Sequence, residues 1–260
     1  MKLKGVLTVL VSATVLAVFV GAVPAAADTF IKQTMFTDAY EMMGTKKPAS
    51  YDTTETWLGK DMARMNAADN KSTILRADKN MIYMLDNTAK EYAEMPLDAF
   101  GDIAKMAQLD NDEEAAKVAE MMKAMMGAIK VTVTPTEETK KVGDWDCTRY
   151  VLEMTMPMGS QQMDMWATED LEIDADMYRL LTSSFMSNMP GFQDMMTEMK
   201  KIKGMTVFST GKVEMMGSEV TSSTEIIEFQ KKDAPAGNYD IPEGYKKIKM
   251  AEINRMGPSQ

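Results

Sequence analysis

Methionine is the residue type in this sequence with the most distinctive chemistry. The chain of 260 residues contains 30 methionines and no histidine. Residues 151–170 read VLEMTMPMGSQQMDMWATED and are especially rich in methionine. Methionine thioethers bind soft cations such as copper(I), and they also make flexible apolar surfaces that fill irregular space. The methionines therefore allow three interpretations: a soft-metal site, a wall that holds a hydrophobic ligand, or ordinary core.

Strand alternation decides which of these side chains could act together. Alternate residues of a strand share a face, and a turn at residues 159–160 would bring a second strand alongside the first. The shared face of the two strands would carry Leu152, Met154, Met156, Met158, Met163 and Met165. We expect these residues to form one continuous thioether-lined surface.

Two predicted helical segments, near residues 97–127 and 174–201, could cover that surface. Apolar residues recur at helix spacing in both, and a Gly or Pro-Gly closes each pattern. Facing the sheet they would present Met122, Met125, Met177, Leu181 and Phe185. We predict that these five residues and the six strand residues together line a site for a lipid or another hydrophobic small molecule.

Copper(I) is the alternative ligand. The spacings Met154-x-Met156-x-Met158 and Met122-x-x-Met125 allow thioether coordination, but they lie in regular strand and helix patterns. No metal site and no cofactor is therefore assigned. The absence of histidine also excludes Ser-His-Asp and Cys-His catalysis and histidine-ligated metals, so we predict that the protein is not an enzyme.

The N-terminus has the pattern of an export signal. Lys2 and Lys4 precede an apolar run from residue 6 to residue 20, and three alanines at 25–27 offer a cleavage site. We predict a cleaved signal peptide over 1–27 and a periplasmic or secreted product over 28–260. No later stretch is apolar enough to span a bilayer, so we expect no transmembrane segment after cleavage.

The net charge of −10 argues against two classes of partner. Nucleic acids and anionic lipid headgroups both require clustered Lys and Arg, which an acidic chain does not supply. The single cysteine, Cys147, cannot form an internal disulfide, and we expect it to be a buried small residue. Stability must then come from packing alone.

The pattern along the chain favours a single β-rich domain over 28–260. Residues 29–95 alternate in polarity between Gly, Pro and Asn-Asp breaks, as in an antiparallel meander, and strands resume after residue 129. We expect an α+β fold: a large curved antiparallel sheet with helical insertions near 97–127 and 174–201 packed on its concave face.

Five stretches carry a resemblance to a known family: Ile31 to Ala49, Thr56 to Met65, Ser72 to Leu97, Val133 to Gly159 and Trp166 to Asp174. They resemble a bacterial family of exported proteins known as domain of unknown function 4412. It implies a fold similar to LolA and LolB, the periplasmic lipoprotein carrier and its receptor: a half-barrel with helices on its concave side. The family brings no catalytic residues. This chain is long, acidic and methionine-rich, so lipoprotein transport does not follow.

The leading hypothesis is an exported, non-enzymatic binder or carrier of a lipid or acyl chain. The alternatives are copper(I) binding through thioethers, and an envelope interaction module with a solid core and an unknown protein partner.

Overall fold

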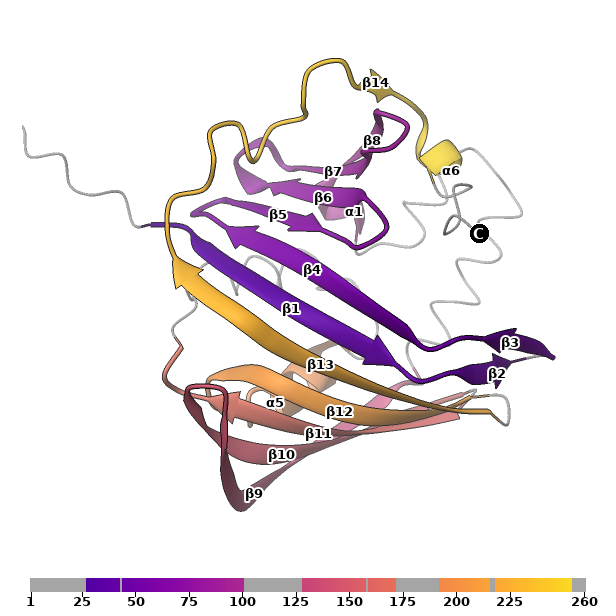
Figure 1. Cartoon of the computed structure of the whole chain (residues 1–260), viewed down its shortest axis with the longest axis vertical. Helices are drawn as coiled ribbons and strands as arrows, with labels where there is room; N and C mark the ends of the chain where they lie inside the picture. The colour runs from indigo at the N-terminus through magenta and orange to yellow at the C-terminus, as the bar shows by residue number, and fades with distance from the viewer. Residues whose placement is uncertain are drawn as a thin grey trace, which may run out of the picture.

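The protein is built on one large sheet, shown by a computed structural model that describes residues 27–42, 44–100, 128–157, 159–171, 192–215 and 218–253. Twelve strands form the sheet in the order β14-β8-β7-β6-β5-β4-β1-β13-β12-β11-β10-β9, and it twists and curves across its width (Figure 1). A small second sheet, β2-β3, projects from one end. The strands are β1 (Thr29–Thr37), β2 (Tyr40–Met42), β3 (Thr45–Lys47), β4 (Ser50–Leu58), β5 (Met62–Asn66), β6 (Lys71–Arg76), β7 (Met81–Asp86), β8 (Glu91–Pro96), β9 (Lys130–Val142), β10 (Trp145–Met156), β11 (Gly159–Thr168), β12 (Met205–Met215), β13 (Ser218–Lys231) and β14 (Lys246–Lys247).

Antiparallel neighbours that follow one another in the chain account for most of the pairing. The predicted meander over residues 29–95 is confirmed, since β4 to β8 pair in sequence order. The two halves of the sheet join where β1 pairs with both β4 and β13. β14 is the exception, because it runs parallel to β8.

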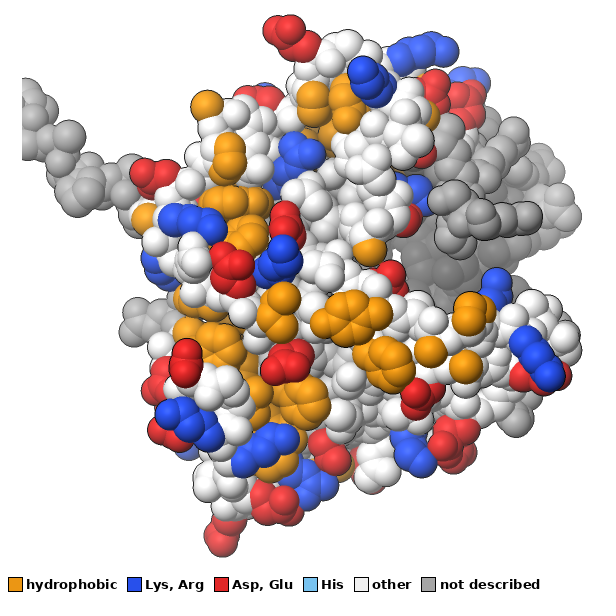
Figure 2. Space-filling view, in the orientation of Figure 1, with side chains coloured by type: hydrophobic (Ala, Val, Ile, Leu, Met, Phe, Trp, Pro, Cys, Tyr) orange, Lys and Arg blue, Asp and Glu red, His pale blue; other side chains and the backbone are white. Residues whose placement is uncertain are grey.

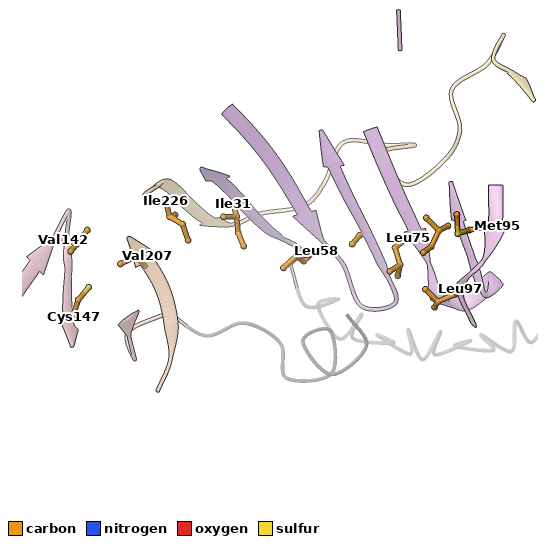
Figure 3. Packing of buried hydrophobic residues seen from close by; sticks show 11 residues of the cluster. Ile31, Leu58, Leu75, Met95, Leu97, Val142, Cys147, Val207 and Ile226 are labelled. Carbon is orange, nitrogen blue, oxygen red and sulfur yellow. The ribbon is translucent and has the colours of Figure 1, made fainter. Parts of the chain in front are cut away.

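An apolar row crosses one face of the sheet, called here the inner face. Ile31 of β1, Leu58 of β4 and Leu75 of β6 are each less than a tenth exposed and belong to one core cluster. Figure 3 shows the whole cluster, which extends from Val142 and Cys147 at one end to Met95 and Leu97 at the other. The register and period-two alternation place Ile31, Leu58 and Leu75 on the same side of the sheet.

The opposite, outer face has its own smaller core. Phe30 and Trp57 stack there with ring centroids 4.7 Å apart, and Tyr239 from the segment after β13 covers them together with Ile74 and Leu85. We call residues 234–245 the C-terminal strap.

Two arginines hold the C-terminal strap against the outer face. Arg76 donates to the carbonyl of Tyr239 at 3.2 Å and to the carboxylate of Asp240 at 2.8 Å. Arg64 donates to the carbonyl of Asn238 at 3.1 Å. The strap is therefore fixed by charged donors around an aromatic core.

The expected α+β fold with helices packed on the concave face is wrong. Within the described residues the chain is nearly all strand, and its α-helices are α1 (Leu97–Phe100), α5 (Phe192–Met199) and α6 (Met250–Ile253). The longest has eight residues. In the described part of the chain the alternating strand pattern predicts the observed structure better than the helix spacing of apolar residues does. Residues 101–127 and 172–191, which hold most of the two predicted insertions, lie outside the described residues.

Candidate functional site

The methionine-rich strands pair in the register that alternation predicts. In the β10-β11 pair, Leu152 lies directly opposite Met163, and Met154 lies opposite Gln161. Met165 lies opposite Tyr150. Because directly opposite residues of a sheet share a face, Leu152, Met154, Met163 and Met165 lie on one surface. We call these four residues the methionine wall.

The methionine wall belongs to the inner face. Met165 lies opposite Ser209 of β12, Ser209 lies opposite Thr224 of β13, and Thr224 lies opposite Met35 of β1. This row of neighbours connects the wall to the central strand of the sheet. Because Met35 and Ile31 alternate on the same side of β1, the wall shares the inner face with Ile31.

The wall is buried at its base and half-buried toward the β10-β11 hairpin. Leu152 is 5% exposed and Met165 is 9% exposed, whereas Met154 and Met163 are half-buried. Val133, Tyr150 and Ala167 complete the cluster. The half-buried thioethers are the part of the wall that a ligand could contact without opening the core.

A glycine of the neighbouring strand makes room for Met163. Gly211 of β12 lies directly opposite Met163, and a Cβ added to Gly211 would lie 2.7 Å from the Cγ of Met163. It would also lie 3.1 Å from the carbonyl oxygen of Gln162. Met163 therefore leans over β12 because that position has no side chain.

Helix α5 lies against the edge of the sheet beside the wall. Met199 and Ile202 pack against the wall's cluster. The carboxylate of Glu198 accepts a hydrogen bond at 2.8 Å from the backbone N–H of Val133, in the edge strand β9. The Tyr150 hydroxyl accepts another at 3.2 Å from the N–H of Lys203. These bonds fix the helix and occupy an edge N–H of β9.

The charge on Glu198 is stabilised by its partners. Lys201 donates to it at 2.7 Å, and this hydrogen bond, followed by the one from Val133, holds the pKa of Glu198 below its ordinary value of 4.5. The ionised carboxylate is therefore the form that binds β9.

The outer side of the same strands is polar and aromatic. Arg149 of β10 donates to Asp164 of β11 at 2.7 Å, and it also pairs with Glu138 of β9. Lys140 lies 3.9 Å above the ring of Trp166. In these strands the ion pairs of Arg149 thus lie on the face opposite to the thioethers of the wall.

Only part of the predicted site falls within the described structure. Leu152, Met154, Met163 and Met165 are brought together, but the ligand-binding role given to them stays a prediction. The side chain of Met156 lies outside the described residues, as do the whole of Met122, Met125, Met158, Met177, Leu181 and Phe185.

Sequence reasoning missed other members of the cluster. Val133 could have been found from the alternation of Val131 and Val133 in β9, and Met199 from its helix. Gly211 carries no local signal, because its role depends on which strand lies beside β11.

Other site chemistry is limited in the described part of the chain. Among those residues, no three His, Cys, Asp or Glu side chains are grouped to hold a metal ion. Cys147 is buried as expected, and burial raises the pKa of its thiol. No helix in the described ranges is long and apolar enough to cross a membrane.

The fold and the comparison with known proteins together classify the chain. The fold defines it as a protein with one broad, mainly antiparallel sheet. The family model of the Domain of unknown function (DUF4412) matches residues 36–245, which is most of the chain. The chain therefore belongs to this family, and the resemblance noted in the sequence is confirmed.

Comparisons with individual proteins add little. No curated protein matches the chain. Among solved structures, "Structure of PNGF-II in C2 space group" is similar with a TM-score of 0.35 and 12% sequence identity. The match covers 88% of this chain and 32% of that one, so this chain corresponds to about a third of that structure's length.

Proposed function

We propose that the protein is an exported, non-enzymatic binder or carrier of a hydrophobic ligand, a lipid or acyl chain, which it holds against the methionine wall. The observation that carries the proposal is that Leu152, Met154, Met163 and Met165 lie together on the inner face. The thioethers of Met154 and Met163 are half-buried there. An unbranched, polarizable side chain can repack around acyl chains of different shape.

The energetics of the wall suit an apolar ligand. Each methylene removed from water is worth about 0.8 kcal/mol, before the cost of immobilising the ligand is subtracted. Within β10 and β11 the ion pair of Arg149 and Asp164 lies on the opposite face, and the Glu198–Lys201 pair lies at the edge of the sheet beside β9. A ligand on the wall would therefore desolvate thioethers rather than charges, which keeps the cost of binding low.

Saturable uptake of a fluorescent fatty acid tests the proposal. We expect Met154→Gln and Met163→Gln to weaken uptake severalfold, because an amide in the contact surface must lose water without gaining a partner. Met62→Gln is the matched control, since Met62 is half-buried against the outer-face core. Absence of saturable uptake by the unaltered protein, or an equal loss in all three variants, would refute the proposal.

An envelope interaction module is a second candidate, supported by a different observation. Phe36 and Tyr51 lie opposite each other on β1 and β4, on the outer face, and are 38% and 66% exposed. Figure 2 shows hydrophobic side chains exposed among charged ones over this region. If this candidate is correct, Tyr51→Ser abolishes co-purification of a protein partner and leaves fatty acid uptake unchanged.

A further inference from the structure

The methionines of the inner face differ widely in their access to solvent. Met35 of β1 and Met65 of β5 are 44% and 45% exposed. Met95 of β8 is 1% exposed, and Met165 of β11 is 9% exposed. All four residues belong to one sheet, so the same fold contains two exposed methionines and two buried ones.

The two open methionines sit among polar neighbours on the inner face. Met35 lies opposite Asp52 on β4 and opposite Thr224 on β13. Met65 lies opposite Thr56 on β4 and opposite Thr73 on β6. The side chains nearest to each across the sheet are thus hydroxyls and a carboxylate, and a hydrated oxidant can approach both sulfurs.

Packing does not explain why methionine occupies these two positions. A residue that stays nearly half exposed buries only about half of its surface, and another apolar side chain of similar size would bury as much. The thioether is chemically different from other apolar side chains because peroxides and hypohalous acids oxidise it readily. The property that distinguishes methionine at these exposed positions is therefore the reactivity of its thioether toward oxidants.

We propose that Met35 and Met65 form an oxidant-reactive site, at which hydrogen peroxide or a hypohalous acid is reduced while the buried methionines are spared. With peroxide, a sulfur lone pair attacks one peroxide oxygen, an S–O bond forms and the O–O bond breaks. The leaving hydroxide takes the proton of the transferred hydroxyl and departs as water. Each methionine loses two electrons and becomes a sulfoxide, and each peroxide gains them.

The location of the pair limits the damage that oxidation does. A sulfoxide is polar, and its formation in a core disrupts packing. At Met35 and Met65 the new oxygen faces solvent and the Thr and Asp side chains beside it. The sheet therefore keeps its fold after both residues are oxidised, and methionine sulfoxide reductases can restore them.

Residue-resolved peptide mass spectrometry of the full chain during exposure to hydrogen peroxide tests the proposal. We expect Met35 and Met65 to be oxidised at least about tenfold faster than Met95 and Met165. The circular dichroism spectrum should be unchanged when the fast pair is fully converted, and sulfoxide reductases with a thiol reductant should return both residues to methionine. Equal rates for the four residues, loss of the fold during the fast phase, or failure of the reductases to restore the pair would overturn the proposal.

A double variant, Met35→Leu with Met65→Leu, separates exposure from general reactivity. Leucine keeps the apolar volume and removes the thioether. We expect the slow oxidation of Met95 and Met165 to keep its rate in this variant, because their burial is unchanged. Rapid oxidation of either buried residue in the folded variant would show that burial in this sheet does not protect sulfur, and the proposal would fail.

Discussion

At the scale of single residues, the methionine wall depends on what lies beneath it as much as on the thioethers. Met163 leans over Gly211, where a Cβ would lie 2.7 Å from its Cγ. Contacts this close are not tolerated in a packed interior, so one of the two residues must move when the glycine gains a side chain. Glycine at position 211 thus allows the Met163 side chain to lie close to the backbone of β12.

The substitution Gly211→Ala tests this dependence. We expect it to lower the free energy of unfolding by about 1–3 kcal/mol, because the new methyl group overpacks the space under Met163. Truncation of the neighbour, Met163→Ala, removes the clashing Cγ, so the double variant should be more stable than the sum of the two single changes predicts. Urea unfolding of the four proteins measures this coupling, and strict additivity would show that the contact does not restrict β12.

At the scale of elements, two peripheral segments are attached to the sheet by few polar contacts. Helix α5 is joined to β9 through Glu198, and the C-terminal strap is joined to β5 and β6 through Arg64 and Arg76. Segments held in this way open more easily than the strands beneath them. Their local stability can therefore be changed without unfolding the sheet.

Removal of the carboxylate in Glu198→Ala should expose the backbone N–H of Val133. Because β9 is an edge strand, this donor has no strand partner to replace Glu198. We expect hydrogen exchange at the Val133 amide to accelerate by roughly threefold to tenfold. Glu198→Gln is the matched control, since its amide oxygen can still accept the bond. Unchanged exchange in the alanine variant would mean that α5 does not protect this edge.

Acid should loosen the same contact. The pKa of Glu198 is lowered in the folded protein, so its contribution is present above the ordinary value of 4.5 and is lost as pH falls through the lowered pKa. The protection factor of the Val133 amide should thus stay constant above pH 4.5 and fall at lower pH. Glu198 is the titrating partner in this contact. A protection factor that begins to fall above pH 4.5 would contradict this assignment.

Loss of the Arg76 side chain should release the C-terminal strap. Arg76→Ala removes ion pairs to Asp78 and Asp240, and it should cost about 1–2 kcal/mol, because both carboxylates are partly exposed. We expect faster proteolysis within residues 234–245 and a red shift in the fluorescence of Trp57. Arg149→Ala also removes two ion pairs but lies far from the strap in the sheet order, so it should leave the strap intact. Equal proteolysis of both variants would show that Arg76 is not the attachment.

At the scale of the whole molecule, local patterns predicted the strands and their faces but not the architecture. Alternation identified the shared face of Leu152 and Met163, because that information lies within one hairpin. The pairing of β1 with β13 joins Thr29 to Lys231, and no local pattern encodes a contact across most of the chain. The same limit explains why the sequence pattern overestimated the share of helix in the fold, since the burial of strand faces depends on distant partners.

The family assignment leaves the ligand as the central question. The chain belongs to a family whose function is not defined, and its inner face combines half-buried thioethers with a continuous apolar row. The net charge of −10 disfavours anionic surfaces, and the methionine wall offers apolar contact to a ligand. The central question is therefore whether a ligand occupies the methionine wall.

Native mass spectrometry followed by denaturing mass spectrometry, on protein purified without detergent, measures that occupancy directly. We predict an additional mass in the native spectrum that is lost on denaturation and has the fragmentation pattern of a lipid or fatty acid. A native spectrum with only the mass of the bare chain, or with an adduct of copper, would contradict the proposal that the methionine wall holds a hydrophobic ligand.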